Sequence, residues 1–560
     1  MTLGRTLPIV VLIAILAAAP CAHAAWPAQW RTYGGLSDGI WEDTSHWHPH
    51  PTYYPHNGNP CDWDVYLNYL SGDYFVEVSE SHPVTSITAA NAGGTTQLTN
   101  WTGARVYLEF TSFTNTGALD VENIDLYGPV TNQGTWTVRG GMVNYNGDVT
   151  NHASALFNVK GNLSAKGTFT NDGETRAYAA ASLWADTLIN NDRLCLLGGA
   201  VGSDAELANP ADSLITGAGS LYAPAGIDNA GTLRAETGAL SLYCDGGTLT
   251  STGDIEARPN AALFIDADEV VHEGTLTVRA GGGVTLTRCD LVNPAGARID
   301  LLGGILSATN VTHEAAAAFE GFGCIDLPGD GGGPGALTNQ GDMEFYADTR
   351  VIGNLDNQAG ATIEGRNGDL TVVGDLTNNG TIIWENGGVY WEGACSGAGT
   401  LTLSGEETKA ANGAMTLSSG GALNITGTGP AQVYADIDSA GTVTVAPEAA
   451  AVFRGSLSGT GAYQNDGVVE FHGSTGSPSM SVGAIEGAGS VDVTGGASVT
   501  ATGLRQRSLA VAGGCSLTVG PDGAVLEDPL DIDAADLGTL VFEGLLDNSV
   551  GQTITKTGEG

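Results

Sequence analysis

The stretch Asn132-Gln-Gly-Thr-Trp-Thr-Val138 decides the fold, because similar phrases return about every twenty residues along most of the chain. In each phrase an asparagine precedes a small or polar residue, a glycine, and threonine alternating with aliphatic residues. Copies stand at Asn229-Ala-Gly-Thr-Leu233 and Asn379-Gly-Thr-Ile-Ile383, and a looser one at Ala440-Gly-Thr-Val-Thr-Val445. A fixed period of this length is typical of a repeat architecture whose units stack on their neighbours.

The segments after the glycine alternate with a period of two, as in Thr275-Leu-Thr-Val278 and Ser516-Leu-Thr-Val519. Alternation places the aliphatic side chains on one face of a strand and the hydroxyl side chains on the other. An antiparallel sandwich can use this pattern too. An asparagine at one position per period fits coils better, because stacked amides form hydrogen-bonded ladders. Since parallel crossovers are almost always right-handed, we predict an all-β, right-handed parallel β-helix.

The corners of this solenoid are predicted at the asparagine or at the residue that replaces it. They fall near Asn115, Asn132, Asn151, Asn171, Asn190, Asn209, Asn229, Ser251, Glu273, Asn293, His313, Asn339, Asn357, Asn378, Gly397, Ser439, Asn465 and Glu486. Two steps are longer than the others. The step after His313 contains Asp330-Gly-Gly-Gly-Pro334, which we expect as an extruded loop, and the step from Gly397 to Ser439 is expected to hide a degenerate coil.

The chain is predicted to contain three parts. Residues 1–24 fit a secretory signal: Arg5 precedes an apolar run over residues 7–19, and Ala22-His-Ala24 fits the cleavage rule. Residues 25–99 are predicted as an irregular, aromatic-rich N-terminal cap and the first strands. Residues 100–560 are predicted as the repeat β-helix of about twenty residues per coil, incomplete at its C-terminus because Gly560 falls within a repeat phrase. No membrane insertion is expected, because no later segment is apolar over a spanning length.

The chain is strongly acidic, with 62 Asp and Glu against 20 Lys and Arg and a net charge of -42. Binding to nucleic acid requires a basic patch, so nucleic acid is excluded as a partner, and anionic lipid is excluded for the same reason. Surface carboxylates favour weak binding of Ca²⁺. The sequence contains neither an EF-hand loop nor the Gly-rich calcium nonapeptide. We therefore assign no cofactor.

Seven cysteines follow the predicted signal, at Cys61, Cys195, Cys244, Cys289, Cys324, Cys395 and Cys515. Their spacings are wide and no CxxC pair occurs, so neither a zinc knuckle nor a redox pair is indicated. We predict that these cysteines act as small apolar residues inside the solenoid.

A histidine cluster stands in the predicted cap. It consists of His46, His48, His50 and His56, with Cys61, Asp62 and Asp64 close behind. Imidazole and carboxylate groups bind zinc or copper, which would make the cluster a metal site. The alternative is a solvated loop, with Trp30, Trp41, Trp47 and Trp63 covering the first coil. We predict the loop and assign no metal ligand, because nothing in this Pro-rich stretch fixes the geometry of the histidines.

Catalytic motifs are absent from the sequence: it contains no Gly-x-Ser-x-Gly elbow, no His-Glu-x-x-His pair and no phosphate loop. We therefore assign no catalytic and no cofactor-binding residue. A β-helix enzyme would cluster Asp, or Asp and Arg, across consecutive coils. The Asp residues considered are Asp254, Asp266, Asp268, Asp326, Asp330 and Asp348, none of which we pair with a second Asp one coil away beside a basic residue. Aromatic residues that could stack on sugars are Tyr145, Trp184, Tyr222, Tyr390 and Trp391, although each also fits an ordinary outward strand position.

Two segments carry a resemblance to a known family. Gly397-Ala-Gly-Thr-Leu-Thr-Leu-Ser-Gly405 and Thr553-Ile-Thr-Lys-Thr-Gly-Glu-Gly560 are similar to the two halves of the core of autotransporter-associated β-strand repeats. The opening Gly39-Ile-Trp41, followed by Trp47 and a Pro-rich turn, also fits such proteins. The chain thus resembles the passenger domains of bacterial autotransporters and, more loosely, filamentous haemagglutinin-like adhesins.

The resemblance implies a bacterial protein that is secreted or displayed on the outer-membrane surface. The β-helix of such passengers hosts adhesins, proteases, esterases and inert stalks, so the fold does not settle the function. We expect a non-catalytic structural or adhesive stalk whose partners are polysaccharides or other cell-surface ligands. Two alternatives stay open, a polysaccharide lyase or hydrolase on the same fold and a passive spacer for a further domain.

Overall fold

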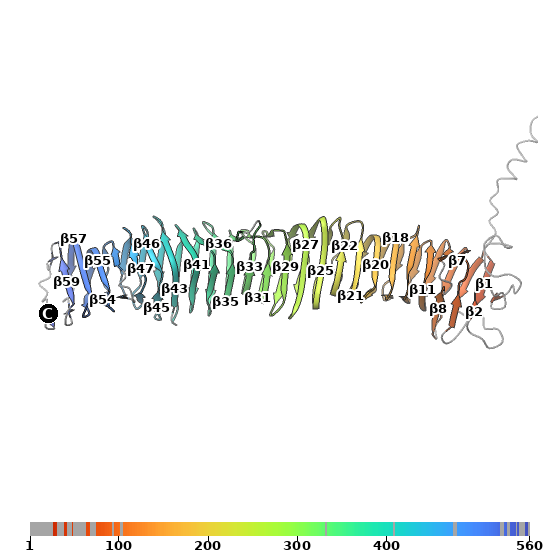
Figure 1. The fold of residues 1–560 in the computed structure, drawn as a ribbon, viewed down its shortest axis with the longest axis horizontal. Coiled ribbons are helices and arrows are strands. Elements are labelled where there is room, and N and C mark those ends of the chain that lie inside the picture. The colour runs from red at the N-terminus through yellow and green to blue at the C-terminus, as the bar shows by residue number, and fades with distance from the viewer. Residues whose placement is uncertain are drawn as a thin grey trace, which may run out of the picture. The chain divides into compact units, whose positions relative to one another are not determined.

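The structure is a computed structural model in which the described residues are 26–30, 39–41, 47–48, 63–67, 74–91, 94–100, 105–330, 333–406, 409–473, 479–526, 531–534, 538–544, 546–547 and 555–557. Every regular element in these ranges is a β-strand. The described residues contain no helix that could span a membrane. The strands stack in parallel as a β-solenoid of about 22 turns, which confirms the predicted all-β parallel β-helix (Figure 1). The predicted signal, residues 1–24, lies outside the described residues.

The chain divides into two compact units, residues 1–204 and 205–560. In the first unit a coil consists of three strands: β13 (Val130–Asn132), β14 (Thr135–Val138) and β15 (Met142–Tyr145). Each pairs in parallel with the equivalent strand of the next coil, which are β16 (Val149–Asn151), β17 (Leu156–Val159) and β18 (Asn162–Asn171). The repeat phrase therefore forms one corner and the strand that follows it, as the sequence indicates.

Large side chains fill the interior of the first unit. Trp136, from the repeat phrase, is fully buried, and its ring lies 5.0 Å from that of Phe113 and 5.8 Å from that of Phe157. Because equivalent residues of adjacent coils occupy the same register, apolar side chains stack on like side chains along the interior. Burial of an aromatic or aliphatic side chain contributes about 1.5–3 kcal/mol, so each coil is stabilised mainly by the coils on either side of it.

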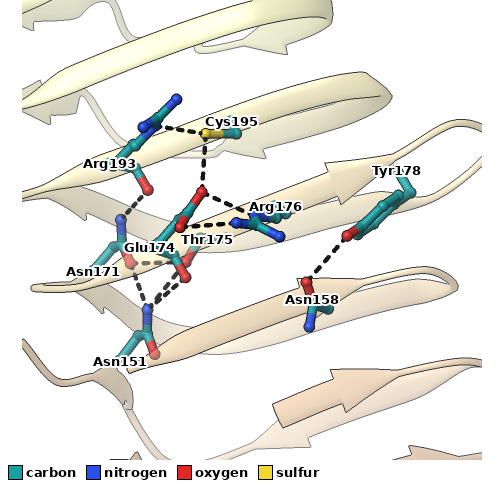
Figure 2. A network of polar contacts seen from close by, with 9 residues as sticks. All are labelled: Asn151, Asn158, Asn171, Glu174, Thr175, Arg176, Tyr178, Arg193 and Cys195. Carbon is teal, nitrogen blue, oxygen red and sulfur yellow. Dashed lines mark hydrogen bonds and ion pairs between the residues drawn. The ribbon is translucent and has the colours of Figure 1, made fainter. Parts of the chain in front are cut away.

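The predicted asparagine ladder is present in the first unit. The Nδ2 groups of Asn115, Asn132, Asn151 and Asn171 each donate to the Oδ1 of the next asparagine, at 2.8, 2.7, 2.8 and 2.7 Å, and the last of these bonds reaches Asn190. Figure 2 shows one rung, in which Asn171 also accepts from Thr175 Oγ1 at 2.7 Å and donates to the Arg193 carbonyl at 3.0 Å. The ladder thereby satisfies amides that would otherwise be unpaired in the interior.

The second unit contains the same type of ladder, with other residues in place of asparagine at some positions. Asn209 donates to Asn229 at 2.6 Å, Asn229 donates to Ser251 Oγ at 2.9 Å, and Asn339 donates to Asn357 and Asn357 to Asn378, both at 2.8 Å. Ser251 is in register with His272, not with the predicted Glu273. That corner prediction was wrong by one residue, because strand alternation turns His272 inward and leaves Glu273 exposed.

A second corner prediction, Glu486, was also wrong by one residue. Glu486 pairs with Gln464 and is exposed, so the neighbouring Gly487 occupies the corner. Glycine offers no side chain to the ladder. Gln506 replaces it: its Oε1 accepts from Asn465 Nδ2 at 2.8 Å and its Nε2 donates to the Gly487 carbonyl at 3.4 Å. The longer glutamine side chain thus spans the ladder position at which glycine has no side chain.

The two long steps have different explanations. The expected degenerate coil lies in β43 (Lys409–Leu417), where Leu417 is in register with Gly397 of β41 (Gly388–Gly397) and with Ser439 of β46 (Asp436–Ser439). The expected loop separates β33 (Ala318–Asp326) from β34 (Ala336–Asn339). Residues 331–332 of this loop lie outside the described residues.

Parallel stacking already begins before the predicted start of the repeat at residue 100. Strand β1 (Trp26–Trp30) pairs with β4 (Trp63–Leu67), and β4 pairs with β7 (Ser86–Ala89). The side chains of Trp41, Trp47 and Trp63 are buried, and Trp47 Nε1 donates to the Trp41 carbonyl at 2.7 Å. The side chain of Trp30 lies outside the described residues.

The cysteines follow the sequence prediction with one departure. Cys195, Cys244, Cys289, Cys395 and Cys515 are buried, whereas Cys324 is partly exposed. Burial raises the pKa of the Cys395 thiol to about 12, which keeps it protonated and unreactive at neutral pH. Cys61 lies outside the described residues.

Candidate functional site

Tyrosines form a stacked column on the outer surface of the first unit. It is made of Tyr107 in β9 (Val106–Glu109), Tyr127 in β12 (Ile124–Tyr127) and Tyr145 in β15. The Tyr127 and Tyr145 rings are stacked with centroids 4.6 Å apart, and Tyr107 is tilted by 60° at 5.0 Å from Tyr127. Tyr127 and Tyr145 are paired in register. The column therefore presents an exposed ring at Tyr107 and half-buried rings at Tyr127 and Tyr145 on successive coils.

Charged groups border this column. Arg105 Nη1 donates to the Tyr145 hydroxyl at 3.2 Å and lies 3.4 Å from Asp125 Oδ2. Burial raises the pKa of the Asp125 carboxyl, and the Arg105 charge opposes that shift. Further along the same unit, Trp184 packs over Gly202 and its Nε1 donates to Asp204 Oδ1 at 2.8 Å. The surface thus combines aromatic area with both donors and acceptors.

The second unit has an aromatic pair of the same kind. Tyr222 in β23 (Leu214–Tyr222) and Tyr243 in β25 (Thr232–Ser251) are in register, with stacked rings 4.8 Å apart and 13° between their planes. Both are more than a third exposed. Tyr243 is followed in register by Asp266, which forms an ion pair with Arg288 at 2.7 Å.

Most of the aromatic residues singled out from the sequence have outward positions, but one does not. Tyr145, Trp184, Tyr222 and Tyr390 are exposed or half-buried. Trp391 is only 4% exposed, and its Nε1 donates to the Ala414 carbonyl at 2.8 Å. Its assignment as a sugar-stacking candidate was wrong, because Tyr390 and Trp391 are adjacent in a strand and only one of them can face outward.

A groove of about 420 Å³ lies on the second unit. It is lined by Gly303, Gly304, Ile305, Gly323, Cys324, Asp348, Thr349, Arg350, Asp369 and Thr371. These residues come from β31 (Arg298–Ser307), β33, β35 (Asp342–Ile352), β38 (Leu370–Val373) and the corner before β38. The groove therefore crosses consecutive coils.

The groove results from a change in the length of one corner. In β33 a single residue, Phe322, separates the positions that pair with Phe345 and Thr349, whereas β35 has three residues there. Gly304 and Gly323 are in register, and the shorter corner beside them carries the exposed side chain of Phe322. The longer corner projects beyond them and carries Asp348. A step forms at this point, and the groove occupies it.

Asp348 and Asp369 occupy equivalent corners of adjacent coils. Asp348 Oδ1 accepts from the backbone N–H of Asp369, 21 residues later, at 2.9 Å. Asp369 Oδ1 accepts from the N–H of Gly388 at 2.8 Å. Arg350 is exposed and lines the same groove. This is the combination of two Asp residues one coil apart beside a basic residue that was not found in the sequence. The spacing of Asp348 and Asp369 is the signal that would have revealed it.

The histidine cluster predicted in the cap is not tested. His46, His50, His56, Cys61 and Asp62 lie outside the described residues, as does the side chain of His48. Asp64 Oδ1 accepts from Ser86 Oγ at 2.6 Å. Among the residues that the structure describes, no group of three or more His, Cys, Asp or Glu side chains is placed to hold a metal ion.

Comparison with known proteins identifies no relative of this chain. No protein-family model matches the chain, and neither a curated protein nor a solved structure matches it.

Proposed function

We propose that the protein is an exported bacterial β-helix of the cell surface with a structural or adhesive, non-catalytic role, and that it binds polysaccharide through its stacked tyrosines. The observation that carries the proposal is the stacking of surface tyrosines from successive coils. Tyr127 and Tyr145 pair in register, with Tyr107 beside Tyr127, and Tyr222 and Tyr243 pair in register and are exposed. Tyrosine gives a large amphipathic contact area at low entropic cost. A surface that repeats from coil to coil matches a polysaccharide, whose sugar units also repeat along the chain.

Affinity in such a protein would come from many weak contacts acting together. Each tyrosine contributes one rigid ring and one hydroxyl. Once one tyrosine has bound the polysaccharide, binding by the neighbouring tyrosines becomes intramolecular. The Arg105 and Asp125 pair beside the first column supplies a donor and an acceptor for sugar hydroxyls. The net charge of -42 favours neutral polysaccharides over acidic ones, since like charges repel.

The test is retention of the full chain on immobilised neutral polysaccharides, compared with a double variant that carries Tyr127→Ala and Tyr145→Ala. We expect the double variant to lose at least about tenfold in affinity, or about 1.4 kcal/mol. Tyr434→Ala is the matched control, because Tyr434 is 49% exposed and lies outside both columns. Absence of binding by the wild-type chain, or equal binding by the double variant, would refute the proposal.

The groove favours the second candidate function, a polysaccharide lyase or hydrolase. Glycoside hydrolysis uses a pair of carboxyl groups, and Asp348 and Asp369 are two carboxylates on adjacent coils beside Arg350. The distinguishing assay measures released reducing ends and unsaturated products from a polysaccharide panel. Turnover that disappears with Asp369→Asn would favour the enzyme, and binding without turnover would favour the adhesive protein.

A further inference from the structure

The groove on the second unit has the size of a small-ligand site. Its volume of about 420 Å³ lies within the range of ligand pockets. Gly303, Gly304 and Gly323 line the groove; Gly304 is buried, and the Phe322 ring lies against Gly303. Ile305 is 50% exposed and supplies an apolar wall. The two tyrosine columns contribute no residue to its lining.

The polar groups of the groove are fixed in position. The Oδ1 atoms of Asp348 and Asp369 each accept a backbone N–H of the next coil, which anchors both carboxylates. Among the residues that the structure describes, the Oδ2 atoms of these two carboxylates have no hydrogen-bond partner, so they are free to accept from a ligand. The groove thereby offers two immobilised acceptors one coil apart, about 4.8 Å.

Arg350 adds a donor that makes no hydrogen bond to the protein within the described residues. Several other arginines form ion pairs, as Arg139 does with Asp120 at 2.7 Å and Arg279 does with Glu256 at 2.6 Å. In the described part of the chain Arg350 forms no ion pair, although the protein carries 62 acidic residues. A guanidinium in a groove, with its hydrogen-bonding capacity unused, is available to a ligand.

The charges of the groove select the ligand class. Two carboxylates outnumber one guanidinium, and the whole chain is strongly acidic, so an anionic ligand such as a uronate is repelled. An uncharged ligand must donate to the carboxylates and accept from Arg350. Sugar hydroxyls do both, and the C–H face of a pyranose ring matches the apolar wall at Ile305.

We propose that this groove is a binding subsite for a neutral saccharide unit, with Asp348 and Asp369 accepting from its hydroxyls and Arg350 donating to them. The inference deepens the proposed function, on which it rests, because it assigns a second contact with the same polysaccharide and names its class as neutral.

The test uses calorimetric titration of the full chain with neutral oligosaccharides and with uronate oligosaccharides of equal length. Asp369→Asn retains a side-chain oxygen that can accept from Gly388 N–H and replaces the ligand-facing acceptor with a donor. We expect it to weaken binding of the neutral oligosaccharide at least about tenfold, and Arg350→Met to do the same. The matched control is Asp375→Asn, since Asp375 Oδ1 accepts from Ala394 N–H at 2.8 Å in the same way but lies outside the groove.

Cys324 provides a local readout, because it lines the groove while the other described cysteines are buried. We expect the neutral oligosaccharide to slow alkylation of Cys324, measured by peptide mass spectrometry, and Asp369→Asn to abolish this protection. Preferential binding of uronates, wild-type affinity in both groove variants, or unprotected Cys324 would overturn the subsite. If the groove variants bind normally but the variant with Tyr127→Ala and Tyr145→Ala binds polysaccharide more weakly than the wild type, the proposed function stands without the groove. If neither the groove variants nor the tyrosine variant changes binding, the subsite and the proposed function are both wrong.

Discussion

His313 shows how one residue replaces another in the interior ladder. Most coils place an asparagine at this corner, and His313 accepts from Asn293 Nδ2 through Nδ1 at 3.0 Å and donates from Nε2 to the Asp342 carbonyl at 3.0 Å. A neutral imidazole has one acceptor and one donor, so it satisfies both partners. A protonated imidazole has two donors, and its Nδ1–H would face the amide donor of Asn293.

This arrangement predicts a pH-dependent stability. Burial lowers the pKa of His313 below its usual 6.5, and the bond to the Asp342 carbonyl opposes the shift. Between the lowered pKa and 6.5 the unfolded chain binds more protons than the folded one. The free energy of unfolding therefore rises with pH in this window, by up to about 1.4 kcal/mol per pH unit. The stabilisation is complete above pH 6.5 and is lost as pH falls through the folded pKa.

The measurement is urea unfolding of the wild type and His313→Asn from about pH 5 to about pH 8. We expect the asparagine variant to have a shallower slope, because the amide restores the ladder without a titrating group. His272, whose pKa is also lowered by burial, retains its own contribution in both proteins. His152→Asn is the control, since His152 is exposed and should leave the slope unchanged. A slope of wild-type steepness in His313→Asn would contradict this account.

At the scale of the coil, the corners depend on glycines that no other residue can replace. Gly321 in β33 has a φ of +129°, and a Cβ at this position would collide with the Leu301 carbonyl oxygen of the preceding coil. We expect Gly321→Ala to lower the free energy of unfolding by at least about 2 kcal/mol, because it combines a strained backbone conformation with a backbone clash.

Gly283 in β29 (Gly283–Thr287) is the matched control for this prediction. It lies in a strand of the same unit, and a Cβ there would meet only the Ile305 carbonyl oxygen at 3.8 Å. Gly283→Ala should change the unfolding midpoint in urea little or raise it slightly. Equal losses in Gly321→Ala and Gly283→Ala would show that the corner conformation does not limit stability.

Strands with a strong alternation of apolar and polar residues were predictable from the sequence, whereas individual contacts of the interior ladder were not. The phrase at Asn132 predicts the coil, the ladder and the inward face of Trp136, because each depends on local alternation. Gln506 could not be recognised, since its bond to Asn465 spans 41 residues and two coils. The groove escaped prediction for a related reason. It arises from the difference in corner length between two neighbouring coils, and neither coil is unusual alone.

At the scale of the whole molecule, stacking in register also aligns charges. Asp300, Glu320, Glu344 and Glu364 are paired in register along four consecutive coils. Arg298 contacts the first two and Arg366 contacts Glu364, so the column carries more carboxylates than guanidinium groups. Coils are about 4.8 Å apart, which is closer than the screening length of about 10 Å at 0.1 M salt. The fold therefore bears repulsion that the net charge of -42 extends to the whole chain.

Salt should consequently stabilise the protein. Raising NaCl from about 0.1 M to about 1 M shortens the screening length to about 3 Å, below the coil spacing. We expect the thermal unfolding midpoint, measured by circular dichroism, to rise by at least about 3 °C. Glu344→Gln should be more stable at low salt and should gain less from NaCl, because one charge of the column is removed. Glu273→Gln is the control: Glu273 is exposed, and its counterparts on the adjacent coils, Thr252 and Pro294, carry no charge. A midpoint that stays constant or falls with NaCl would mean that the ion pairs of Arg298 and Arg366 outweigh the repulsion along the column.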